Sequence, residues 1–90
     1  MQIKAYILFN VNSGSEKEVC KKISDFKEVL DTSVVYGEYD LVARVSVEDL
    51  GQLNTIVDEA RVIPGVIFTR TMIVAQEYKG KTRRDGSNPT

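Results

Sequence analysis

The stretch "VVYGEYDLVARV", residues 34–45, decides how this chain folds. Two runs of β-branched and other apolar residues flank residues 37–40, which is the pattern of two antiparallel strands joined by a turn. Gly37 can take a positive φ at little cost, so the sequence predicts a tight hairpin with Gly37-Glu38 at its tip. A turn does not explain Asp40, a charged residue that begins the next apolar run.

The segments around this hairpin predict two more strands. Residues 3–11 carry an apolar side chain at every second position, which is the period of a half-buried strand. Residues 66–76, "VIFTRTMIVAQ", predict a long final strand, and the hairpin strands are expected at 29–36 and 39–47.

Two helices are predicted between the strands. Ser15 and Glu18 have the spacing of a capping box, which places a helix start at Ser15. Asp49 is expected to cap a second helix, with Gln52 at its third position, and "IPG" at 63–65 to end it. Their apolar stripes are Val19, Cys20, Ile23 and Phe26 in the first helix, and Leu50, Leu53, Ile56, Val57 and Ala60 in the second.

The order β-α-β-β-α-β predicts an α+β, ferredoxin-like domain, with a four-stranded antiparallel sheet and two helices on one face. The other sheet face would carry Tyr6, Leu8 and Val42, which are too apolar to remain in water as one patch. We therefore expect this open face to be a dimer interface. The domain should span residues 1–78, and the polar residues 79–90 should form a disordered tail.

Charge and composition exclude several classes of protein. Residues 1–78 hold 8 basic and 12 acidic side chains, so the predicted domain is acidic and a poor candidate for binding nucleic acid. The tail is basic through Lys79, Lys81, Arg83 and Arg84, and a solubilising role is favoured over nucleic-acid contact. The chain has no histidine and one cysteine, which argues against a metal site, a cofactor and most acid–base catalysis. No signal peptide or membrane span is visible, so a cytoplasmic location is expected.

Two interpretations of Asp40 stay open at this point. In the structural interpretation it ends the hairpin or pairs with Arg44, two positions along the same strand face. Alternatively, a carboxylate beside the exposed amides of a turn offers an acceptor for an ammonium group and donors for a carboxylate. Those two demands together describe a free amino acid.

Other polar residues also carry a structural and a functional interpretation. Thr69 and Thr71 share one face of the last strand, where they either pack or donate hydrogen bonds to a small polar ligand. Arg70 points to the opposite face and is interpreted as structural. Cys20, on an apolar stripe and without a histidine to activate it, is interpreted as core packing.

Residues 34–74 resemble the effector-binding (RAM) domain of the Lrp/AsnC family of amino-acid-responsive transcriptional regulators. The resemblance rests on G-x-Y-D at residues 37–40, on "IPGV" at 63–66 and on "TRT" at 69–71. It implies a unit that dimerises through its sheet and assembles into rings of four or more dimers, such as octamers or decamers. It also implies that a free amino acid binds between dimers, with Gly37, Tyr39 and Asp40 at the ligand and Thr69 and Thr71 opposite.

The resemblance stops at the DNA-binding part of those regulators. They carry an N-terminal helix-turn-helix domain, whereas this sequence starts at the first predicted strand, so DNA binding is not expected to transfer. The chain resembles stand-alone members of the family instead. Such a protein would sense or store amino acids, or assemble with full-length Lrp/AsnC-type regulators through a shared interface.

Two other classes of function compete with this interpretation. Small dimeric ferredoxin-like proteins include monooxygenases and isomerases, although the absence of histidine argues against most of them. A purely structural subunit would bind no amino acid at all. A saturable ligand that is not turned over would separate a sensor from both alternatives.

Overall fold

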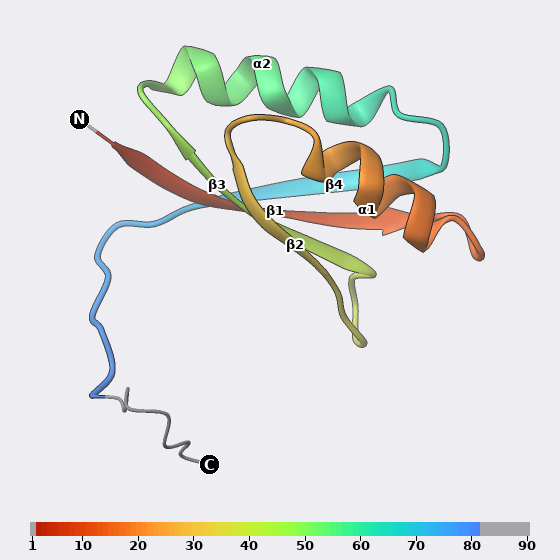
Figure 1. Cartoon of the computed structure of the whole chain (residues 1–90), viewed down its shortest axis with the longest axis horizontal. Helices are drawn as coiled ribbons and strands as arrows, with labels where there is room; N and C mark the ends of the chain where they lie inside the picture. The colour runs from red at the N-terminus through yellow and green to blue at the C-terminus, as the bar shows by residue number, and fades with distance from the viewer. Residues whose placement is uncertain (1, 82–90) are drawn as a thin grey trace.

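The computed structural model describes residues 2–81 and confirms the predicted order of elements (Figure 1). Four strands form one antiparallel sheet with the order β2-β3-β1-β4, and both helices cover the same face of it. This is the ferredoxin-like α+β arrangement. The elements are β1 (Ile3–Val11), α1 (Glu16–Ser24), β2 (Val29–Val34), β3 (Leu41–Val47), α2 (Leu50–Arg61) and β4 (Val66–Ile73).

The core lies between the sheet and the two helices. Alternate residues of the central strands β1 and β3 are buried, as the period-two pattern predicts, and Phe9 is the largest of them. Helix α1 contributes Val19 and Ile23, and α2 contributes Leu53, Ile56 and Ala60. All buried side chains in the described part of the chain are apolar, so hydrophobic burial is the main source of stability.

The sheet face opposite the helices carries several apolar side chains, together with Arg44 and Arg70. Leu8 pairs with Val42 on β3 and with Arg70 on β4, which places all three on this face. Phe68 and Met72 lie beside Arg70, and they are 44% and 49% exposed. We call the set Tyr6, Leu8, Val42, Phe68 and Met72 the open sheet face.

Details of both helices differ from the sequence-based expectation. Helix α1 begins one residue after Ser15, and the predicted capping box is wrong, since the Ser15 side chain makes no cap hydrogen bond. In α2 the predicted cap is confirmed, because Asp49 accepts a hydrogen bond from the Gln52 amide at 2.8 Å. Leu50, predicted to be buried, is 54% exposed, because it lies in the first turn of α2, where the helix starts.

The predicted two-residue turn at Gly37-Glu38 is wrong. Strand β2 ends at Val34 and β3 begins at Leu41, two residues short of the predicted bounds on each side, so the connection is a six-residue loop, 35–40. Gly37 does take a positive φ, of 137°. Hydrogen bonding continues one step beyond both strand ends, since the Val35 amide donates to the Asp40 carbonyl at 2.9 Å and the Asp40 amide donates to the Phe9 carbonyl on β1 at 2.8 Å.

The last strand is shorter than predicted, and most of the tail is not described. Strand β4 ends at Ile73, not at residue 76, although the Val74 amide still donates to the Lys4 carbonyl at 2.9 Å. From residue 82 onward, the predicted disordered tail with Arg83 and Arg84 lies outside the described residues. Neither helix within residues 2–81 has the length and apolar character that a membrane crossing requires.

Gly65, in the turn before β4, is a position where only glycine fits. Its φ is 102°, and an added Cβ would lie 3.0 Å from Ser15 Cβ and 3.1 Å from Ser15 Oγ. We expect Gly65→Ala to lower the free energy of unfolding by at least about 1–3 kcal/mol, since it adds a contact to the backbone strain.

Urea denaturation measures this loss, and Gly37→Ala is the matched control. Gly37 also has a positive φ, but no atom lies within 4 Å of its Cβ position. The control should therefore lose only the strain contribution. Equal losses in the two variants would show that the contact with Ser15 is relieved without cost.

Candidate functional site

Loop 35–40 is fixed to strand β1 by three hydrogen bonds. The Asp40 amide donates to the Phe9 carbonyl at 2.8 Å, and Asn10 Nδ2 donates to the Glu38 carbonyl at 2.9 Å. The third bond runs the other way, from the Val11 amide to Asp40 Oδ2 at 2.9 Å. A loop held at three points presents its side chains and amides in one geometry.

Asp40 therefore has a structural partner in its own chain. Its carboxylate satisfies the Val11 amide where the register between β1 and β4 shifts, at Asn10/Val11. The alternative interpretation from the sequence, that Asp40 pairs with Arg44, is wrong. Arg44 binds Asp31 across the β2–β3 ladder, through Nε to Oδ1 at 3.0 Å and a second nitrogen to Oδ2, and this bond lowers the pKa of the Asp31 carboxyl.

This structural bond occupies only part of the Asp40 carboxylate. Within residues 2–81, Oδ1 receives no hydrogen bond, and the side chain is half-buried, so it is held in place yet still reachable. An ionised carboxylate has about four lone-pair sites, so it can hold the Val11 amide and accept from a second donor at once. The arrangement suits a cationic group such as an ammonium.

The aromatic residues of the loop are arranged differently from one another. Tyr39, predicted to lie at the ligand, is half-buried, whereas Tyr36 is fully exposed at 101%. The sequence interpretation passed over Tyr36, although an aromatic residue beside a glycine in a loop was a signal for it. A tyrosine with no contact area in its own chain is available to line a cleft with another molecule.

Thr69 and Thr71 lie on the helix side of β4, away from the open sheet face. Thr69 pairs with Phe9 and Thr71 with Ile7, both of which point into the core. Leu41, the residue after Asp40, also pairs with Phe9, so Thr69 is two strand spacings, about 10 Å, from this end of β3. The structure thus groups Gly37, Tyr39 and Asp40, but within one chain it does not bring the two threonines to them.

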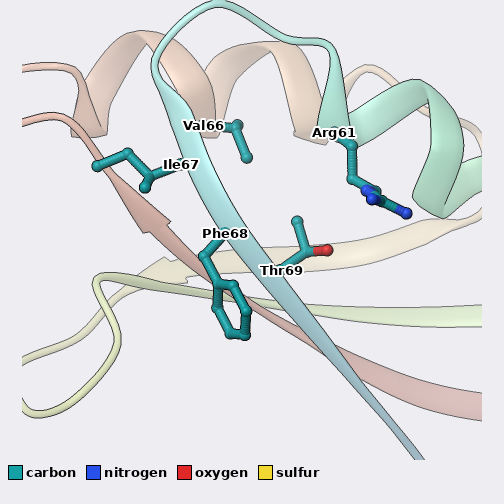
Figure 2. Close-up of a pocket in the computed structure, with 5 residues that line it drawn as sticks. All are labelled: Arg61, Val66, Ile67, Phe68 and Thr69. Carbon is teal, nitrogen blue, oxygen red and sulfur yellow. The ribbon is translucent and has the colours of Figure 1, made fainter.

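Thr69 lines a cavity of about 390 Å³ with Arg61, Val66, Ile67 and Phe68. Figure 2 shows Arg61 reaching down from the end of α2 on the side of β4 where Thr69 points its hydroxyl, while Phe68 points away below the strand. Sequence analysis missed Arg61. Its position in the last turn of a helix gave no signal, because a cation there is accounted for by the helix dipole.

The lone cysteine and the metal-binding residue types within residues 2–81 form no second candidate site. Cys20 is half-buried in α1 and packs against the core, and burial raises the pKa of its thiol, which agrees with a packing role. No group of three or more metal-binding side chains occurs in the described part of the chain.

The family described as the Lrp/AsnC ligand binding domain matches residues 4–84. This chain belongs to the Lrp/AsnC family. This chain is 34% identical over 80 residues to the HTH-type transcriptional regulator FL11 of Pyrococcus furiosus. The match covers 89% of this chain and 53% of FL11. The chain therefore spans about half the length of the curated relatives it matches.

Solved structures show the same Lrp/AsnC fold. The crystal structure of hypothetical protein PHS023 from Pyrococcus horikoshii is 38% identical, with a TM-score of 0.75, covering 84% of this chain and 93% of that one. The complex of regulator NMB0573 with L-Met, from Neisseria meningitidis, has a TM-score of 0.78 and covers 89% of this chain and 54% of that one. Its identity is 22%, so this second likeness shows the fold alone. The family match identifies this chain as a ligand-binding domain of the Lrp/AsnC type.

Proposed function

We propose that this chain is a non-enzymatic module that senses a free amino acid and assembles with copies of itself to control a transcription regulator. The observation that carries the proposal is the Asp40 carboxylate, fixed by the Val11 amide and still able to accept another donor. A fixed anion beside the amides of a glycine-containing loop matches the ammonium and carboxylate groups that every free amino acid carries.

The family supports this proposal in two ways. The matched residues belong to a ligand-binding domain, and the curated relatives are transcriptional regulators. The regulator NMB0573, which has the same fold, was solved in complex with L-Met, so methionine is one ligand to test. The proposed ligand contacts are Asp40 to the ammonium, the amides around Gly37 to the α-carboxylate, and Tyr39 as part of the cleft wall.

Assembly is part of the same proposal, because one chain supplies only half of the predicted site. The open sheet face is apolar and belongs to a small domain, so a second copy packed on it would remove that surface from water. Dimers joined further would place loop 35–40 of one copy near Thr69 and Thr71 of another. The curated relatives contain a matching domain within a longer chain, so we extend the proposal to mixed assemblies with such regulators.

A thermal-shift panel of the twenty amino acids tests the proposal on the full chain. We expect one or a few amino acids to raise Tm, because a ligand at 100 times its Kd adds about 2.7 kcal/mol to the free energy of unfolding. Calorimetry would then give the Kd, and chromatography of the recovered ligand would show that it is unchanged.

Two results would contradict the proposal. A panel with no shift, repeated by calorimetry at millimolar ligand, would favour a purely structural subunit. Conversion of a bound compound into a product would favour a small ferredoxin-like enzyme.

A further inference from the structure

The cavity beside β4 offers hydrogen-bond donors and a positive charge, with no negative charge to oppose them. Of the five residues that line it, Arg61 is the only charged one and Thr69 adds a hydroxyl. The other three are apolar residues, and the Phe68 side chain points away from the cavity. A few polar groups that converge on a small cavity fix the orientation of a ligand bound there. Here the polar groups select an anion.

Arg61 is not occupied by an acidic partner. The ion pairs found within residues 2–81 join Lys4 and Lys79 to Glu77, and Arg44 to Asp31, and none involves Arg61. Asp58 lies one turn earlier on α2, yet it forms no ion pair with Arg61. The five N–H donors of this guanidinium therefore remain available to a bidentate acceptor such as a carboxylate.

The free edge of the sheet adds backbone donors at the same place. Strand β4 lies at the edge of the sheet, so within residues 2–81 one of its sides has no neighbouring strand. The Val74 amide points to β1, since it donates to the Lys4 carbonyl, and amides alternate in direction along a strand. The amides of Thr71 and Thr69 therefore point to the free edge, and that of Thr69 lies beside the cavity.

We propose that Arg61, with Thr69, forms a carboxylate subsite that makes the effector an acidic amino acid. This inference rests on the proposed function: the Asp40 loop of one copy would hold the ammonium end, and the Arg61 cavity of a neighbouring copy would hold the side-chain carboxylate. Arg61 is then the residue that decides specificity between an acid and its amide. A charge-assisted pair of this kind corresponds to roughly 10- to 100-fold in Kd.

The test compares acids with their amides on the full chain by calorimetry. We expect aspartate or glutamate to bind at least about 10-fold more tightly than asparagine or glutamine, and Arg61→Gln to remove that preference. Arg61→Lys keeps a charge at the helix end but loses the bidentate fork, so it should retain the Tm of the ligand-free protein and lose most of the preference. Lys22→Gln removes a positive charge from an exposed position of α1, outside the cavity, loop 35–40 and the open sheet face, so this control should keep the preference.

The outcomes separate this inference from the function on which it rests. If neutral amino acids bind wild type and Arg61→Gln equally and acids bind no better, the carboxylate subsite is wrong and amino-acid sensing stands. If succinate or glutarate binds in an Arg61-dependent way but no amino acid does, the subsite stands and amino-acid sensing is wrong. If none of these compounds binds, both are wrong.

Discussion

Asp40→Asn is expected to weaken binding of the amino-acid effector about 10- to 100-fold while leaving the fold intact. The substitution keeps an oxygen that can accept from the Val11 amide, so the bond that fixes the loop survives. It removes the negative charge, and hydrogen bonds to charged groups contribute about 1.5–3 kcal/mol, more than neutral ones. Calorimetry with the amino acid found for wild type measures the change.

Asp40→Ala is the companion variant that separates the two roles of this side chain. It removes the charge and also leaves the Val11 amide without its partner, which costs about 1–3 kcal/mol of stability. For a domain of this size each kcal/mol corresponds to roughly 4–8 °C in Tm. We therefore expect Asp40→Ala to lower the ligand-free Tm and Asp40→Asn to preserve it. Tight effector binding retained in Asp40→Asn would assign Asp40 to the fold alone.

The sequence predicted the fold, but it did not predict the partner of the Asp40 side chain. The period-two pattern of β1 and β3, together with the cap at Asp49, was enough for the fold, because each of these signals depends on neighbours within one element. The partner of Asp40 was not predictable, since Val11 lies 29 residues away and its amide becomes available only where the β1–β4 register shifts.

The candidate site was predictable to a smaller extent. Both faces of β4 are largely apolar, so the sequence left open which face Thr69 and Thr71 would take, and pairing with Phe9 and Ile7 decides it. Arg61 was missed because its role depends on a cavity between two elements, and no sequence pattern reports such a cavity. Residues that act through surfaces shared by separate elements, or by separate copies, require the structure.

Leu8→Arg is expected to convert the assembled protein into a folded monomer. Leu8 lies at the centre of the open sheet face, with Val42 on one side and Arg70 on the other. In a symmetric pair of sheets the change acts twice, and burying one leucine contributes about 1.5–3 kcal/mol. Losing two such contributions, and adding a charge beside Arg70, should raise the dimer dissociation constant by roughly a thousand-fold or more. Sedimentation velocity measures the mass, and circular dichroism checks the fold.

A control variant and a measurement of effector binding show whether the effect of Leu8→Arg is specific to the open sheet face. Leu50→Arg places the same charge on a leucine that is 54% exposed at the start of α2, outside the open sheet face, and should leave the dimer intact. Because β1 separates loop 35–40 from β4 in one chain, the proposed site is complete only between neighbouring copies. Leu8→Arg should therefore also lose effector binding, although Asp40, Thr69 and Thr71 are unchanged. A monomeric Leu8→Arg variant that binds the effector as tightly as wild type would place the whole site within one chain.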